Sequence, residues 1–247
     1  MRSLRALMVF CVLVALRTFS VALFRQETRW VQEPQGDLKQ VFRIVAILNH
    51  TSLYEALLSG QVPLRFLWRM ANHCTIPIAD VTLKRPIVGL FWHMVAGNIV
   101  SVTRERDHTW EQVVQSLDDP ESMVIILPEG RMKRAGGLDK HGKHMRVRGG
   151  IADLIRGIPD GTLLLAYSQG LHHIQVPGQK GLPKFFQPVR LRFETLDLES
   201  YRAELMEGLA EDDVLAFRKR VIADLTERRD RYCTSDIGGL DEPESWK

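Results

Sequence analysis

Short apolar runs that alternate with helical stretches constrain the fold of this chain more than any other feature. The clearest run lies in 122–130, "SMVIILPEG", where five apolar residues in sequence end at a Pro-Glu-Gly corner. Residues 41–48 and 162–169 are also mostly apolar and of strand length. Helical spacing lies between such runs, at 86–97, 107–119 and 149–158. This alternation predicts an α/β domain with a largely parallel central sheet flanked by helices.

Three more segments receive a prediction. A short helix is expected from Thr51 or Ser52 to about Leu58, with Gly60 as its stop. Residues 188–196 alternate apolar and polar side chains, which predicts an edge strand with one face in water. Residues 198–232 predict a long, charged, amphipathic helical region.

The N-terminal 4–24 segment is strongly apolar and just long enough to span a bilayer, but it contains Arg5 and Arg17. An arginine near the middle of a span is costly, so we favour a helix that lies in one leaflet with its arginines reaching the lipid phosphates. A cleaved signal peptide and a helix packed on the protein itself remain alternatives. We place a membrane-associating helix and polar connector in 1–36 and the main domain in 37–247.

Charge and cysteine content narrow the classes of partner. The 247-residue chain has a net charge of +3, so we expect no nucleic-acid partner. Seven of its Lys and Arg residues lie in 131–150 with one Asp, a basic cluster that suits an anionic ligand or membrane surface, or else is a solvated loop. Its three cysteines are far apart, which predicts no disulfide framework, no zinc site and a reducing compartment.

Polar residues able to do chemistry follow several predicted strands. Asn49 and His50 follow the first, Arg104 follows the strand after the 86–97 helix, and 129–131 follow the "SMVIIL" strand. In open α/β sheets ligands collect at the carboxyl ends of the strands. This convergence predicts a site at that edge of the sheet.

The stretch "NHTSLYE" allows two interpretations of Glu55. If His50 precedes the helix, Glu55 in the first turn can fold back onto the imidazole, fix its tautomer and leave the other nitrogen as a base. Five residues of continuous helix would instead turn the two side chains about 140° apart. The alternative is a capping box, with Ser52 as N-cap and Glu55 three residues later.

Two further candidates carry weaker signals. Arg104 could hold an anionic group such as a phosphate by a forked contact. The corner after the 122–127 strand sets Glu129 beside Arg131, which is either part of a site or an ordinary turn with a surface ion pair.

Taken together, these blocks resemble the glycerolipid acyltransferases, the family that includes the 1-acyl-sn-glycerol-3-phosphate acyltransferases. The blocks are "NHTSLYE", "PIVGLFWHMVAGNIVSVTR", "LPEGRM" and "RGGIADL", in the family's order over 41–194. The chain departs from the pattern in three places. Glu55 stands where the family has aspartate, the third block lacks its threonine and serine, and "LLLAYSQG" lacks the proline of the family's last block.

The resemblance implies a mechanism and a set of roles. His50 would take the proton of an acceptor hydroxyl, and Glu55 would steady the imidazolium. The donor would be acyl-CoA or acyl carrier protein, the acceptor a lysophospholipid such as lysophosphatidic acid, and no metal or other cofactor would be needed. The predicted substrate-binding residues are Asn49, Arg104, Glu129, Gly130, Arg131 and Arg148. The protein would work at a membrane surface, on the cytoplasmic face of the inner membrane.

Two rival functions come from other classes. "LLLAYSQG" ends a predicted strand with a sequence similar to the nucleophile elbow of serine hydrolases, which makes Ser168 a candidate nucleophile. Against this, 171–186 is predicted as a loop where an elbow needs a helix, and no histidine follows His173. The second rival is a non-catalytic lipid-binding protein in which Glu55 only caps its helix.

Overall fold

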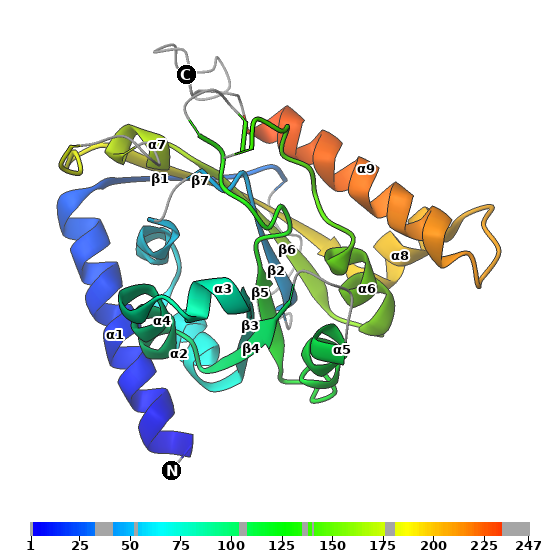
Figure 1. Cartoon of the computed structure of the whole chain (residues 1–247), viewed down its shortest axis with the longest axis horizontal. Helices are drawn as coiled ribbons and strands as arrows, with labels where there is room; N and C mark the ends of the chain where they lie inside the picture. Colours follow the sequence, from blue (N-terminus) through cyan, green and yellow to red (C-terminus); the bar gives the residue numbers. More distant parts are fainter. Residues whose placement is uncertain are drawn as a thin grey trace.

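The computed structural model describes residues 2–32, 42–51, 54–103, 108–134, 138–139, 141–175 and 181–233. In this part of the chain a twisted sheet lies between two layers of helices (Figure 1). Its strands are β1 (Arg25–Trp30), β2 (Phe42–Leu48), β3 (Cys74–Ala79), β4 (Asn98–Val102), β5 (Met123–Ile126), β6 (Thr162–Gln169) and β7 (Pro188–Asp197). The helices are α1 (Arg2–Leu23), the 3-10 helix η1 (Glu55–Gln61), α2 (Leu64–His73), α3 (Asp80–Leu83), α4 (Pro86–Val95), α5 (His108–Gln115), α6 (Gly150–Gly157), α7 (Leu171–Ile174), α8 (Leu198–Met206) and α9 (Val214–Tyr232).

The strand order is β1-β7-β6-β2-β5-β3-β4. The five strands from β6 to β4 run parallel to their neighbours, β7 is antiparallel to β6, and β1 is parallel to β7. Parallel strands need cover on both faces, which is why β5 and β6 are buried along their whole length. The predicted α/β fold, with its largely parallel sheet and N-terminal apolar helix, is confirmed.

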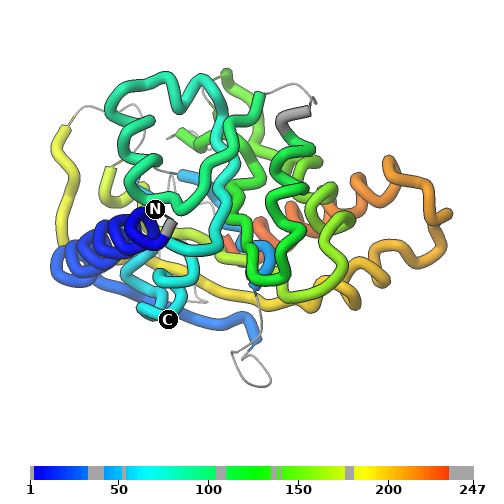
Figure 2. Tube along the Cα trace, turned by 90° about the horizontal axis from the view of Figure 1, so that it is seen from below, coloured from blue at the N-terminus to red at the C-terminus, as the bar shows by residue number. Residues whose placement is uncertain are grey.

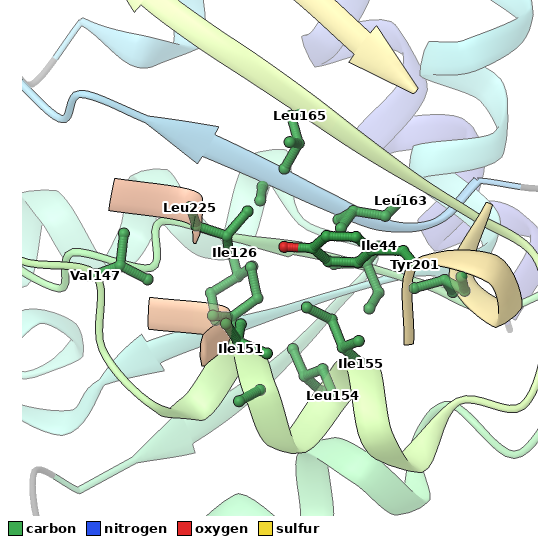
Figure 3. Packing of buried hydrophobic residues seen from close by; sticks show 14 of the residues in the cluster. Ile44, Ile126, Val147, Ile151, Leu154, Ile155, Leu163, Leu165, Tyr201 and Leu225 are labelled. Carbon is green, nitrogen blue, oxygen red and sulfur yellow. The ribbon is translucent and has the colours of Figure 1, made fainter. Parts of the chain in front are cut away.

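Successive side chains of the central strands enter two different cores. Ile44 and Val45 are consecutive in β2, yet the first packs with α5, α6, α8 and α9, and the second with η1, α7 and the residue after α1. Figure 3 shows the first of these cores, where Ile126, Ile151 and Leu225 come together from β5, α6 and α9. Figure 2 shows α1 and the α8–α9 pair at opposite ends of the molecule.

The sheet edge differs from the sequence prediction. Residues 188–196 were predicted to form an edge strand, but β7 lies between β6 and β1. Residues 25–30, assigned to the polar connector, form β1 and pair with β7 from Arg25–Pro188 to Trp30–Phe193. Their polar side chains are matched across the strands, since Arg190 Nε donates to Glu27 Oε2 at 2.7 Å. The predicted boundary between 36 and 37 lies outside the described residues.

The helix α1 has two distinct faces. One stripe is buried against η1, α2 and α4 and contains Ala6, Val9, Leu13 and Ser20. The opposite face exposes large apolar side chains, among them Leu4, Leu7, Met8, Phe19 and Val21. The segment Ser3–Leu23 is long and apolar enough to cross a membrane. Arg17 does not point away from the protein, because its Nε donates to the carbonyl oxygen of Val62 at 3.1 Å.

The helix after β2 starts later than predicted. It is a 3-10 helix that begins at Glu55 and continues through Gly60 to Gln61, whereas the sequence predicted 51 or 52 to Leu58 with Gly60 as the stop. Gly60 is needed for close packing, because a Cβ there would come within 2.8 Å of Ser20 Oγ. Ser20 Oγ donates to the Leu57 carbonyl at 2.6 Å, so η1 is bound directly to α1.

The C-terminal helical region 198–232 is broken. It forms α8 and α9, separated by a turn in which Gly208 has a φ of 71°, in the left-handed region that favours glycine. The two helices pack together against the sheet and against α6.

Candidate active site

The carboxyl ends of β2 and β5 carry predicted site residues side by side. The two strands run in the same direction and pair through 44–46 and 124–126, so the chain leaves both at the same edge of the sheet. Asn49 and His50 follow β2, and the Pro-Glu-Gly corner follows β5. Arg104 lies outside the described residues.

His50 and Glu55 meet, as predicted. Nδ1 of His50 lies 2.6 Å from Oε1 of Glu55, and the two side chains are 18% and 11% exposed. When Nδ1 carries the proton and donates to the carboxylate, Nε2 is left as the acceptor nitrogen. Burial lowers the pKa of His50, but the charge and hydrogen bond of Glu55, together with the charge of Glu129, outweigh it and raise the pKa above its ordinary value.

The capping interpretation of Glu55 has a partial outcome. Glu55 is the first residue of η1, and the residue before it, Tyr54, makes no side-chain capping bond. Ser52, the N-cap of the proposed capping box, lies outside the described residues. Of the two interactions predicted for Glu55, the described residues therefore show the contact with His50.

Asn49 holds the backbone that presents His50. Its φ is 68°, a left-handed conformation that asparagine tolerates better than most residues. Its side chain is fixed on both sides, since Nδ2 donates to the Ser168 carbonyl at 2.8 Å and Oδ1 accepts from Lys133 Nζ at 2.8 Å. The predicted site residue Asn49 thus joins the ends of β2 and β6 to the loop after β5.

Glu129 is buried beneath this turn, with 1% of its surface exposed. Its Oε1 accepts from the backbone N–H of Asn49 at 3.3 Å, and its Oε2 from that of His50 at 2.7 Å. Oε1 also accepts from Arg229 Nη1 at 2.9 Å. Both oxygens accept hydrogen bonds from the protein, so any bond to a substrate, as predicted for Glu129, would have to be made in addition to these.

Sequence reasoning missed Arg229 and Lys133. On α9 the buried residues Phe217, Val221, Leu225 and Arg229 are spaced by four positions and share one face of the helix. An arginine that continues an otherwise apolar stripe is the sequence feature that could have indicated a buried, functional charge. Lys133 belongs to the basic cluster of 131–150, and nothing in the sequence singles it out from the other cations there. Its backbone N–H donates to the His50 carbonyl at 2.9 Å, and burial lowers the pKa of its ammonium despite the nearby charge of Glu129.

The other predicted residues of the corner lie next to this group. Gly130 has a φ of 64° and donates its N–H to the Leu127 carbonyl at 3.0 Å, which closes the turn. Arg131 forms an ion pair with Asp139 rather than with Glu129. Arg148 donates its backbone N–H to the Pro128 carbonyl at 2.8 Å and has an exposed side chain. Of the two interpretations of this corner, the ordinary turn with a Glu129–Arg131 surface ion pair is wrong, because Glu129 is buried and pairs with Arg229.

A comparison with solved structures finds the same architecture. The crystal structure of the 1-acyl-sn-glycerophosphate (LPA) acyltransferase PlsC from Thermotoga maritima superposes with a TM-score of 0.50 and 18% sequence identity, over 88% of this chain and 79% of that one. This chain has the fold of that acyltransferase. No protein-family model and no curated protein matches the sequence.

Within this PlsC-like fold, Ser168 is not presented as a nucleophile. It lies in β6 with none of its surface exposed, and its carbonyl accepts from Asn49. The chain does enter a helix after it, contrary to the predicted loop, but α7 has only four residues and follows Gly170 at a φ of 82°. The geometry therefore gives the serine-hydrolase alternative no support.

Metal-binding chemistry was not expected at this site. Among the residues that the structure describes, no group of three or more His, Cys, Asp or Glu side chains lies together as metal ligands would. The expectation that the reaction needs no metal or other cofactor stays a prediction.

Proposed function

We propose that this chain is a membrane-associated acyltransferase. It moves a fatty acyl group from an acyl-CoA or acyl carrier protein thioester to the hydroxyl of a lysophospholipid, with lysophosphatidic acid as the first acceptor to test. The observation that carries the proposal is the 2.6 Å contact between His50 Nδ1 and Glu55 Oε1 at the carboxyl end of a parallel sheet. The fold shared with a 1-acyl-sn-glycerophosphate acyltransferase supports it.

The chemistry follows from the histidine–carboxylate pair. Nε2 of His50 accepts the proton of the acceptor hydroxyl while the hydroxyl oxygen attacks the thioester carbonyl carbon. The tetrahedral intermediate then breaks its C–S bond, and the leaving thiolate takes the proton from the imidazolium. Glu55 stabilises the imidazolium between these steps, because its carboxylate lies against Nδ1. The products are a lipid ester and a free thiol.

Cations around the corner after β5 would bind the acceptor phosphate. Arg148 presents an exposed guanidinium beside the Gly130 turn, and Arg131 is half-buried in its ion pair with Asp139. Arg104, which follows β4, is the third predicted phosphate ligand. A charge-assisted contact to phosphate contributes roughly 1.5–3 kcal/mol, enough to select an anionic lysolipid.

The apolar outer face of α1 supports a membrane location for the acceptor. Exposed apolar side chains continue from α1 onto α4, with Ile87, Leu90 and Met94, and onto 182–186. The last segment lies against α1, since Phe186 donates its N–H to the Leu23 carbonyl at 2.8 Å. In 56–103 the only acid is Asp80, which pairs with Lys84 at 3.1 Å. An apolar face with few acids suits a bilayer with anionic lipids, and we place it at the cytoplasmic face of the inner membrane.

A radiolabel assay tests this function. Purified protein is mixed with labelled acyl-CoA or acyl carrier protein thioester and a panel of lyso-acceptors with and without a phosphate monoester. We expect labelled diacyl product from wild type and none from folded His50→Ala. Substantial transfer by His50→Ala would contradict the role of His50. Lipid binding without transfer from any donor would favour a non-catalytic lipid-binding protein.

A further inference from the structure

The C-terminal helix α9 reaches the turn that presents His50. Its residue Arg229 is 5% exposed, and its guanidinium donates through Nη1 to Glu129 Oε1 at 2.9 Å and to the Met145 carbonyl at 3.2 Å. Its Nε and Nη2 lie 2.9 and 2.8 Å from Asp230 Oδ1. The guanidinium is thus held by two carboxylates and one carbonyl, at a distance of 179 positions from His50 in sequence.

Glu129 transmits this contact to His50. Its carboxylate accepts hydrogen bonds from the backbone N–H groups of Asn49 and His50. These two groups precede and follow the Cα of Asn49, the residue with the left-handed backbone. A carboxylate in this position fixes the turn, but it also brings a full negative charge close to the imidazole. Arg229 lies on the same oxygen and offsets that charge.

The neighbouring arginine makes no such connection. Arg228 Nη1 donates to Glu194 Oε1 at 2.6 Å, and its Nε donates to Asp224 Oδ2 at 2.8 Å. Glu194 lies on β7 and Asp224 on α9 itself, so the carboxylate partners of Arg228 differ from those of Arg229. Arg228 and Arg229 therefore have the same side-chain chemistry but different carboxylate partners. Arg228 is the more exposed of the two, with 21% of its side chain exposed against 6% for Arg229, and it serves as the control for loss of an arginine from this part of α9.

We propose that Arg229 is a positioning residue for the reaction: it neutralises Glu129, so that Glu129 can fix the His50 turn without holding His50 in its protonated form. This inference rests on the proposed function, in which His50 must be neutral to act as a base. Arg229 does not touch a substrate in this role and acts through Glu129.

The charges around His50 give the sign of the effect. Glu55 from η1 and Glu129 from the corner after β5 favour the imidazolium. Lys133 from the same loop and Arg229 from α9 lie beside Glu129, and their positive charges disfavour the imidazolium. Asp230 pairs with Arg229 and offsets part of its charge. Removal of the Arg229 charge leaves Glu129 less compensated. The pKa of His50 then rises, and less of it is a free base at neutral pH.

The test is a titration of His50 by NMR in protein labelled with ¹³C at the histidine ring, with the His50 signal assigned from His50→Gln. This readout does not depend on turnover. We expect Arg229→Met to raise the pKa of His50 by roughly one unit, Arg229→Lys to keep it near the wild-type value, and Arg228→Met to leave it unchanged. The acid limb of the kcat/KM profile for acyl transfer should move in parallel.

Folding of the variants is checked by circular dichroism, because Arg229→Met leaves a buried carboxylate unpaired. If it fails to fold, the test uses Glu129→Gln alone and Glu129→Gln/Arg229→Met. Glu129→Gln should lower the pKa of His50, because it removes the negative charge that Arg229 offsets, and the added Arg229→Met should leave that pKa unchanged, because no charge remains at position 129 for Arg229 to neutralise.

Equal shifts in the Arg228 and Arg229 variants, or no upward shift on loss of Arg229 from the wild-type background, would overturn the proposal. A Glu129→Gln variant that does not lower the pKa of His50, or an upward shift on loss of Arg229 in the Glu129→Gln background, would also overturn it. If wild type shows no acyl transfer at all, the proposed function fails, and the titration still decides whether Arg229 controls the protonation of His50.

Discussion

The carboxylate of Glu55 reaches Nδ1 of His50 from the first residue of a 3-10 helix that begins five positions after the histidine. Glu55 is the first residue of η1, and the residues described before it, Thr51 and Tyr54, are in irregular backbone. A continuous helix would have turned the two side chains about 140° apart. The 2.6 Å contact therefore depends on the late start of this helix.

The first prediction concerns the charge of Glu55. In Glu55→Gln the negative charge that does most to raise the pKa of His50 is gone, while burial still lowers that pKa, so the pKa of His50 should fall. The acid limb of the kcat/KM profile should move to lower pH. At the same time kcat should fall by roughly 10- to 100-fold, since the lost charge-assisted bond is worth about 1.5–3 kcal/mol. Steady-state rates across pH provide the measurement.

Glu55→Asp is the matched variant, because it keeps the charge and shortens the side chain by one methylene. It should keep the pKa of His50 above that of Glu55→Gln while it weakens the contact. The raised pKa also means that the His50–Glu55 pair stabilises the fold below about pH 6.5 and loses this contribution as pH rises through the folded-state pKa. A stability difference between wild type and Glu55→Gln that grows with pH would contradict this account.

The second prediction concerns the backbone at Asn49. Asn49→Ala removes the bonds to Ser168 and Lys133 and places a Cβ-bearing residue without local hydrogen bonds at a φ of 68°. We expect the free energy of unfolding to fall by about 2–4 kcal/mol, from two lost bonds and the left-handed strain. Asn49→Gly loses the same bonds but not the strain, so it should be less destabilised by about 1 kcal/mol. Urea unfolding of both variants measures this, and equal losses would show that the strain is absent.

The local part of the site could be predicted from the sequence, and the long-range part could not. His50 and Glu55 are five residues apart, and a strand followed by a helix start limits where their side chains can go. Arg229 binds Glu129 across 100 positions, and the sequence of α9 does not reveal which carboxylate its buried face will meet. The stripe that includes Arg229 predicts burial of a charge, but not its partner.

The sheet shows the same division. β5 and β6 were evident because fully buried parallel strands are apolar throughout. β1 was missed because its sequence, "RQETRW", has only one large apolar residue, and its stability comes from cross-strand partners such as Arg190 with Glu27. The alternating pattern of 188–196 predicts an edge strand, but β1 covers that edge of β7. Pairing of charges between segments more than 160 residues apart leaves no periodic signal in either segment.

The third prediction concerns Asp139, which lies in the basic cluster. The backbone N–H of Lys143 and the side chain of Arg131 are the main causes that hold the pKa of Asp139 well below its usual range. A depressed pKa stabilises the fold above the unfolded value of about 3.9, and this contribution disappears as pH falls through the folded-state pKa. Asp139→Asn should therefore lower the thermal midpoint at neutral pH and have a smaller effect as the solution is acidified. An effect of equal size across the acid range would mean that the charge of Asp139 is not involved.

The fourth prediction concerns the exposed face of α1. The buried face of this helix packs with Leu67 and Val95 from α2 and α4, so deletion of 1–25 would uncover a core cluster as well as remove a membrane contact. Substitution of the outer face separates the two effects. Leu4→Gln/Met8→Gln changes two side chains that are 66% and 63% exposed and should leave the thermal midpoint within experimental error of wild type. It should weaken binding to vesicles that contain anionic lipid by at least about tenfold, because each buried Leu or Met side chain contributes roughly 1.5–3 kcal/mol.

The control for this experiment is Leu215→Gln, which removes a side chain that is 60% exposed near the start of α9. The α8–α9 pair lies at the opposite end of the molecule from α1 (Figure 2). Vesicle flotation should not distinguish Leu215→Gln from wild type, whereas Leu4→Gln/Met8→Gln should remain in the soluble fraction. Loss of vesicle binding by both variants would indicate a general effect of surface hydrophobicity. Retention by both would mean that α1 packs on the protein without entering the lipid, because a helix whose outer apolar stripe lies in a bilayer cannot lose two of those side chains without loss of affinity.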